Sequence, residues 1–152
     1  IIVFDFDETL FELNADWAEL RRDNGLRKEI EFRAVKGRSF GYPIVNMLEY
    51  LKNNYDIAIY SRNLSNTIHH VLEASGVMDV FVVGQDSGFL KPDRGGLEAI
   101  AEYYGSEDMI VVGDSWHDRA VAQAYGCDYI PTSGTAETPF VVSIYLGFNS
   151  TF

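Results

Sequence analysis

The chain opens with an apolar, β-branched run, Ile1–Phe4, that is followed at once by two acids, Asp5 and Asp7. Side chains at positions i and i+2 of a strand share a face, so regular geometry would bring both carboxylates together. Burying such a pair costs free energy unless a cation or a shared proton compensates the charge. Open α/β sheets bind ligands at the carboxyl ends of their parallel strands. The run therefore predicts a strand that ends in a functional site.

The composition limits the class of protein. A length of 152 residues suits one domain with a small insertion, and 47% apolar residues can build a core. The formal charge of −11 argues against binding to nucleic acid or to an anionic membrane. Cys127 is the only cysteine, which excludes a disulfide framework, and we expect it to be a buried strand thiol. The sequence contains no signal peptide and no membrane-length apolar segment, so we predict a cytoplasmic protein.

Strand and helix patterns alternate along most of the chain. Apolar runs predict further strands at Ile57–Tyr60, Val80–Val83, Met109–Val112 and Asp128–Ile130. Helical spacing of apolar residues predicts helices over Pro43–Leu51, Ser65–Ala74, Arg94–Tyr104 and Trp116–Tyr125. Near-continuous apolar strands between helices indicate a parallel sheet that is covered on both faces. The predicted fold class is therefore α/β, a doubly wound, Rossmann-like sheet of about five strands in one domain over residues 1–152.

Two segments interrupt this alternation. Residues 11–41 form an insertion, which we interpret as a small helical cap with helices starting at Asn14 and near Leu26. Candidate substrate contacts in it are Trp17, Arg21, Arg22 and Arg38. A solvated helix with one packed Trp is the commoner origin of such a pattern. The apolar tail, Phe140–Phe148, is compatible with an edge strand or with a docking helix.

Polar residues recur just after each predicted strand. Besides Asp5 and Asp7, they include Ser61, Arg62, Asn63, Lys91, Asp114, His117 and Asp118. The carboxyl ends of parallel strands lie along one edge of a sheet, so these side chains can converge on a single site. The set offers acids for a metal ion, a hydroxyl donor, a fixed cation and a potential nucleophile. His69 and His70 have no partners at metal-ligand spacing and are interpreted as surface or packing residues.

These residues resemble the four motifs of the haloacid dehalogenase superfamily. The family pattern DxDx[TV] appears as Asp5-Phe6-Asp7-Glu8-Thr9, its strand-end Ser or Thr as Ser61, its Lys as Lys91 before Pro92, and its GDxxxD as Gly113 to Asp118. Four motifs in the right order at strand ends make the resemblance specific. It spans the chain from the first strand through the helix that follows Asp118.

The resemblance implies a Mg²⁺-dependent phosphatase that hydrolyses phosphomonoesters. Asp5 would attack phosphorus to form an aspartyl-phosphate, and Asp7 would act as general acid and then as general base. Ser61 and Lys91 would hold the transferring oxygens. Each of these four residues is thus a candidate catalytic residue.

The resemblance also implies a metal site and a phosphate site. Asp5, the main-chain carbonyl of Asp7, and Asp114 would bind Mg²⁺, for which hard oxygen ligands are suitable. Asp118 would orient Lys91 or a water on the ion. Further candidates for binding the phosphate, beside Ser61 and Lys91, are Thr9, Arg62 and Asn63.

Several alternatives stay open at this point. A small phosphorylated molecule is the expected substrate, with a phosphoprotein as second candidate because a short cap leaves an open site. A homo-oligomer in which a neighbour completes the cover is a further alternative. Another phosphoryl transferase of the same superfamily, or a non-catalytic phosphate- or metal-binding module, would also use these residues. A signalling receiver domain fits poorly, because no strand between the first and the Asp114 strand ends in a lone Asp.

Overall fold

A five-stranded parallel sheet forms the centre of the computed structural model, which describes residues 1–13, 27–148 and 152. The strand order is β3-β2-β1-β4-β5, so β1 lies in the middle and the chain winds outward to both edges. The strands are β1 Ile2–Phe4, β2 Ile57–Tyr60, β3 Phe81–Val83, β4 Ile110–Gly113 and β5 Asp128–Pro131. The predicted doubly wound α/β fold is confirmed.

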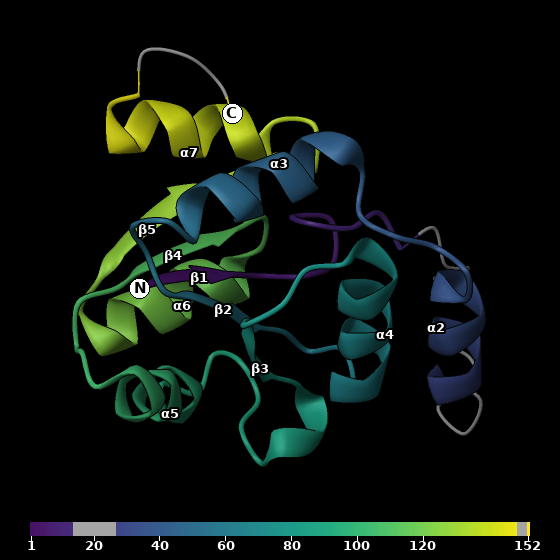
Figure 1. The fold of residues 1–152 in the computed structure, drawn as a ribbon. Coiled ribbons are helices and arrows are strands. Elements are labelled where there is room, and N and C mark those ends of the chain that lie inside the picture. The colour runs from purple at the N-terminus through teal and green to yellow at the C-terminus, as the bar shows by residue number, and fades with distance from the viewer. Residues whose placement is uncertain (14–26, 149–151) are drawn as a thin grey trace.

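Helices cover both faces of this sheet (Figure 1). The covering helices are α3 Tyr42–Leu51, α4 Ser65–Ser75, α5 Gly95–Tyr104, α6 Trp116–Tyr125 and α7 Thr138–Leu146. Helix α2, Arg27–Val35, packs on α4, and a 3₁₀ turn, η1, lies at Gln85–Ser87. Helices α3, α4 and α7 pack in one apolar cluster with alternate strand residues such as Phe4 and Ile59. Helices α5 and α6 pack on the other face with Val3 and Ala58. The strands are apolar on both faces because both faces are buried.

The register of the sheet aligns the ends of its three central strands. Phe4 of β1 pairs with Ile59 of β2 on one side and with Val112 of β4 on the other. The main-chain N–H of Asp5 continues the ladder by donating to the carbonyl of Val112 at 2.9 Å. The residues that follow these strands therefore start from the same level of the same sheet edge.

Within the described residues, the sequence-based elements agree with the structure to within one or two residues. The apolar tail forms helix α7, which packs on β5 and α3 and so settles the choice between strand and helix. Cys127 is not the expected buried strand thiol, because it precedes β5 and is only partly buried. The helix predicted to start at Asn14, with Trp17, Arg21 and Arg22, lies outside the described residues. No helix in the described ranges is long and apolar enough to cross a bilayer.

The side chain of Arg38 links the main chain near the start of residues 11–41 to the main chain at the end of α2. Its Nη1 donates to the carbonyls of Leu13 at 3.0 Å and Ala34 at 2.8 Å, and its Nη2 donates to the carbonyl of Glu12 at 2.6 Å. The guanidinium also lies over the ring of Phe11, 4.3 Å from its centroid. These contacts give Arg38, a candidate substrate contact in the sequence, a structural role. The assignment of residues 11–41 as a cap stays a prediction.

Candidate active site

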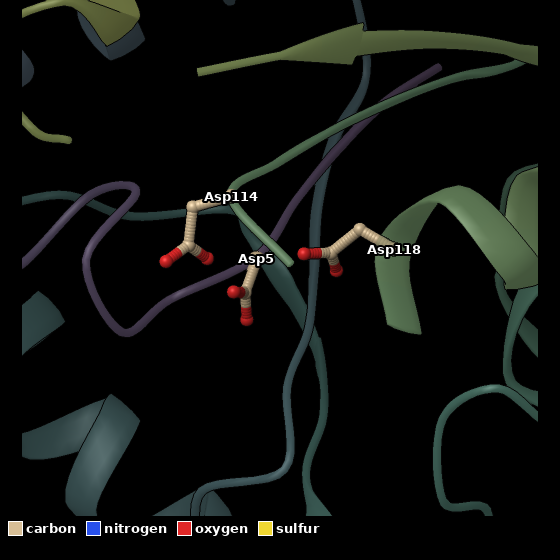
Figure 2. Close-up of side chains that lie close together, drawn as sticks. All are labelled: Asp5, Asp114 and Asp118. Atoms are coloured by element: carbon tan, nitrogen blue, oxygen red, sulfur yellow. The ribbon is translucent and has the colours of Figure 1, made fainter. Parts of the chain in front are cut away.

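A buried lysine links two acids at the carboxyl edge of the sheet. Lys91 Nζ donates to Asp5 Oδ1 at 2.9 Å and to Asp118 Oδ1 at 2.6 Å. All three side chains are buried, and Asp118 is completely inaccessible to solvent. Figure 2 shows the carboxylates of Asp5, Asp114 and Asp118 turned toward one another. Residues from three separate segments, predicted to converge, are thus brought together here.

The loop that carries Lys91 is fixed to the sheet by Tyr60. The Tyr60 hydroxyl donates to the carbonyl of Asp93 at 2.7 Å, and Lys91 Nζ lies 5.9 Å from the centroid of the Tyr60 ring. Gly96 at the start of α5 lets the helix approach closely, because a Cβ there would lie 2.2 Å from the Tyr60 ring. The last residue of β2 therefore sets the position of a lysine much further along the chain.

Asp118 is oriented by the first turn of α6. Its Oδ2 accepts hydrogen bonds from the main-chain N–H of Ser115 at 3.1 Å and from the Ser115 hydroxyl at 3.0 Å. This capping box satisfies helix-end donors and leaves Oδ1 for Lys91. Gly113 makes room for the carboxylate, since a Cβ at that position would lie 2.2 Å from it. The GDxxxD spacing thus has a packing reason as well as a chemical one.

We expect Gly113→Ala to displace Asp118 from Lys91. The added methyl has no space, and overpacking of this kind costs on the order of 1–3 kcal/mol of unfolding free energy. Gly41→Ala is a matched control, because its Cβ would meet only Pro43 at an ordinary 3.8 Å. Urea denaturation of both variants measures the difference. Equal stability of the two variants would contradict the close packing of Gly113 on Asp118.

Asp7 is held apart from this cluster by Asn63. Asn63 Nδ2 donates to Asp7 Oδ1 at 3.1 Å and to Oδ2 at 3.4 Å. The main-chain N–H of Asn63 donates to Ser61 Oγ at 3.0 Å, and Ser61 is fully buried. A hydroxyl that accepts one hydrogen bond can still donate its own proton. Asn63, one of the candidate phosphate contacts, therefore serves to position Asp7 and Ser61.

The backbone turns sharply between the two acids and the following segment. Glu8 has a φ of 62°, a left-handed conformation that is uncommon for a residue other than glycine. Its carboxylate accepts from the main-chain N–H of Leu13 at 3.2 Å, which helps to hold the turn. Backbone strain of this kind is common at functional sites. Asp5 and Asp7, separated only by Phe6, have different partners because β1 ends at Phe4 and the regular strand geometry does not continue through them.

The acids that could share a cation are Asp5, Asp114 and Asp118, which offer oxygens within 4.8 Å of one another in the described part of the chain. Asp118 uses both oxygens for Lys91 and Ser115. Asp5 receives Lys91 and the main-chain N–H of Phe6, both on Oδ1. Asp114 is exposed, and the hydroxyl of buried Thr9 donates to its Oδ1 at 3.4 Å. Asp114 is thus the acid with the most lone pairs left for a hard cation, and the carboxylate of Asp5 lies within reach of the same ion.

Burial shifts the titration of this site. It raises the pKa of Asp5 to about 6, although Lys91 acts against the shift. Burial, and next the charge of Asp5, raise the pKa of Asp7 to about 7, with the Asn63 hydrogen bond acting in the other direction. Burial also raises the pKa of Asp118. Burial alone would lower the pKa of Lys91, but Asp5 and Asp118 outweigh it and raise that pKa. Lys91 is therefore a fixed cation.

Without metal, we expect stability to fall as the pH rises from about 4 to about 7. Asp5 and Asp7 have folded-state pKa values of about 6 and about 7 against an ordinary 3.8, so the folded protein binds more protons in this window than the unfolded chain. One pKa unit corresponds to about 1.4 kcal/mol, so the loss is on the order of 3 kcal/mol or more. Urea denaturation in chelator across this range measures it, and Asp7→Asn should flatten the slope. A stability that rises with pH in this window would contradict the prediction.

Arg62 and His117 meet at this edge of the sheet. Arg62 follows β2 and His117 lies in the first turn of α6 after β4, and β1 lies between those strands. The Nη1 of Arg62 is 2.6 Å from Nε2 of His117. Burial, and next the charge of Arg62, lower the pKa of His117, so the neutral ring accepts this hydrogen bond. Sequence reasoning gave His117 no role, although its place shortly after Asp114 pointed to this edge.

A family model described as haloacid dehalogenase-like hydrolase matches residues 24–131, more than half of the chain. The chain belongs to the haloacid dehalogenase-like hydrolases. The resemblance seen in the four motifs, and the prediction of a hydrolase, are confirmed. The matched segment contains Ser61, Lys91, Asp114 and Asp118 and begins after the acids that end β1. No curated protein sequence matches the chain.

Solved structures of several other hydrolases share the fold. One is a predicted phosphoglycolate phosphatase from Haemophilus somnus, with a TM-score of 0.67 and 18% identity over 89% of this chain and 86% of that chain. A hydrolase from Streptococcus pneumoniae has a TM-score of 0.68 and 19% identity over 93% and 97%. A superfamily hydrolase from Ehrlichia chaffeensis has a TM-score of 0.63 and 16% identity over 95% and 96%. At these identities the likeness concerns the fold alone.

Proposed function

We propose that this hydrolase is a Mg²⁺-dependent phosphatase that cleaves phosphomonoesters through an aspartyl-phosphate on Asp5. The observation that carries the proposal is the placement of two acids with different partners. Asp5 is held through one oxygen by Lys91 at 2.9 Å, whereas Asp7 is held by Asn63 at 3.1 Å. One acid is therefore fixed for attack while the other is free to exchange a proton.

Asp5 is suited to be the nucleophile. Both of its donors, Lys91 Nζ and the main-chain N–H of Phe6, bind Oδ1, so Oδ2 can attack phosphorus. The bond from phosphorus to the leaving oxygen breaks as the new bond to Oδ2 forms. Water then attacks the aspartyl-phosphate, which releases inorganic phosphate and restores Asp5. Lys91 lies beside Asp5, and Ser61 is bonded to Asn63, which holds Asp7. Both Lys91 and Ser61 would offer donors to the oxygens of the transferring group.

Asp7 is suited to move the proton in both steps. In its protonated form it gives the proton to the leaving oxygen, and as a carboxylate it then takes a proton from the attacking water. A pKa of about 7, raised by burial and by the charge of Asp5, allows both forms near neutral pH. Asn63 holds the carboxylate in place through either form by its amide donor.

Asp5, Asp114 and the main-chain carbonyl of Asp7 would hold the Mg²⁺ ion. The fit rests on an excess of negative charge, because Lys91 is the only cation bonded to the acids in the described part of this edge. When bound, the ion lowers the repulsion between an anionic nucleophile and an anionic phosphoryl group. We propose a small phosphorylated molecule as substrate, with a phosphoprotein as the second candidate. The relative from Haemophilus somnus, named for a small phosphorylated acid, supports the first.

Phosphate release from para-nitrophenyl phosphate tests the reaction class. Activity should require Mg²⁺, disappear in chelator and return when Mg²⁺ is added back in excess. Because one aryl ester tests only one leaving group, a panel of small phosphomonoesters belongs in the same experiment, together with labelling of the protein by acetyl phosphate. Absence of both turnover and labelling with Mg²⁺ present would contradict the proposal and favour a non-catalytic phosphate- or metal-binding module.

A further inference from the structure

A stack of two aromatic rings extends from Arg62 toward solvent. The rings of His117 and Trp116 lie 3.8 Å apart between centroids with an interplanar angle of 29°. The Nη1 of Arg62 holds the His117 ring from the side through Nε2 at 2.6 Å. Trp116 is 66% exposed even though its ring is large and apolar. An exposed, ordered aromatic ring beside a catalytic centre is a ready surface for a ligand.

Two residues of this group, Arg62 and His117, are neighbours along the chain of residues at the candidate active site. Arg62 directly follows Ser61, and His117 directly precedes Asp118, whose Oδ1 binds Lys91. Because β1 lies between β2 and β4, the contact from Arg62 to His117 spans the end of the strand that presents Asp5. A phosphomonoester bound for attack by Asp5 would therefore have its leaving group near these side chains.

Charge at this edge also points to Arg62. Lys91 is already bonded to two acids, so an anionic ester at this edge would gain from a second cation. Arg62 makes no ion pair with an acid in the described ranges, and its contact there is to the neutral ring of His117. In a chain with a formal charge of −11, a guanidinium bonded to a neutral ring beside the catalytic acids is suited to attract an anionic ester.

We propose that Trp116, His117 and Arg62 form a leaving-group subsite, and that the preferred substrates are phosphomonoesters whose leaving group carries a planar aromatic ring. This inference rests on the proposed phosphatase function and names its substrate class. The ring would stack on Trp116, as bases stack on exposed aromatic side chains. Arg62 would draw the anionic ester toward Asp5, and His117 would hold both Arg62 and Trp116 in position. A nucleobase and a phenyl ring offer the same stacking surface.

Three substrates test whether the leaving group needs an aromatic ring, and whether a nucleobase and a phenyl ring are equally suitable. Adenosine 5′-monophosphate carries a nucleobase, O-phosphotyrosine carries a phenyl ring, and glycerol 3-phosphate carries neither. Trp116→Ala should raise KM for the two aromatic esters about tenfold, as expected for loss of one stacking contact, and change kcat less than about twofold. It should leave KM for glycerol 3-phosphate unchanged. Trp116→Phe should recover most of the loss because it retains a ring.

Tyr103→Ala is the matched control. Tyr103 is also a largely exposed aromatic, stacked on Phe81 at 4.2 Å, but Phe81 begins β3 and so lies at the opposite edge of the sheet. This variant should change no KM. Equal effects of Trp116→Ala on all three substrates, or no effect on any, would overturn the subsite.

Binding can be measured without turnover, which separates this inference from the proposed function. Trp17 and Trp116 are the two tryptophans of the chain, so a Trp17→Phe background reports Trp116 fluorescence alone. With Mg²⁺ present, adenosine 5′-monophosphate and O-phosphotyrosine should quench this fluorescence, and glycerol 3-phosphate should not. Selective quenching with neither phosphate release nor labelling by acetyl phosphate would keep the subsite and reject the phosphatase. Absence of selective quenching would reject the subsite even if the protein hydrolyses phosphomonoesters.

Discussion

Asp5→Asn is expected to lower kcat/KM for phosphate release by at least about a thousandfold, because an amide oxygen is a poor nucleophile toward phosphorus. The substitution keeps the shape of the side chain, and the amide oxygen can still accept from Lys91 and from the main-chain N–H of Phe6. It also removes a charge from a buried cluster in which the pKa of Asp5 is already raised to about 6. The protein should therefore stay folded while it loses activity.

The measurement pairs turnover with thermal unfolding in chelator. Asp56→Asn is the matched control, since Asp56 is an exposed acid that precedes β2 at the opposite edge of the sheet. It should keep normal activity. Acetyl phosphate should label the native protein and the control but not the Asp5 variant. Normal turnover by Asp5→Asn would reject Asp5 as the nucleophile, whereas loss of turnover together with loss of folding would reject the assumption that the amide is tolerated.

Lys91→Met is expected to destabilise the protein by about 3–5 kcal/mol as well as to abolish activity, because it leaves two buried carboxylates without their cation. Lys91 is 3% exposed and bonds Asp5 at 2.9 Å and Asp118 at 2.6 Å. Met has a similar length and fills much of the same space, so the loss reports charge rather than a cavity. Urea denaturation at about pH 7.5 gives the free energy of unfolding.

A second substitution makes this prediction specific. Adding Asp118→Asn to Lys91→Met removes one of the two orphaned charges and should recover part of the stability but none of the activity. Lys52→Met is the surface control, because its pair with Glu49 at 3.8 Å joins a partly exposed lysine to an exposed acid at the end of α3. Exposed pairs contribute about 0–1 kcal/mol, so this variant should be close to native. Equal losses at positions 52 and 91 would show that the buried triad is not a source of stability.

The sheet was predictable because both of its faces are buried. Strands covered on both sides must be apolar throughout, and a short run such as Ile57–Tyr60 between turn residues is typical of a buried strand. For the tail, the sequence did not decide between a strand and helix α7. Its segment is apolar almost all round, so neither the alternation of a strand nor the stripe of a helix stands out. Its packing on β5 and α3, which a single sequence does not reveal, decides the structure.

At the candidate site, the spacing of the motifs predicted which residues gather, but it did not predict most of the bonds between their side chains. The sequence motifs indicated which residues gather at the edge, and Lys91 does contact Asp118 as expected. The motifs did not indicate that Asn63 would hold Asp7, or that Arg62 would reach His117. Those contacts depend on the order of strands in the sheet, which brings the ends of β2 and β4 to either side of β1. The left-handed conformation of Glu8 was not predicted either, because Gly, Asn and Asp signal such a turn in a sequence and Glu does not.

Arg38 has a consequence for how this protein can change over evolutionary time. Its guanidinium bonds the main chain near the start of residues 11–41, at Glu12 and Leu13, to the main chain in the last turn of α2, at Ala34. The cap predicted for residues 11–41 therefore has its start and its end bonded to each other through one side chain. We expect segments of different length to be exchangeable there without moving Asp5 or Asp7, which follow β1. Under the cap prediction, divergence in what the enzyme recognises is separable from the chemistry that it performs.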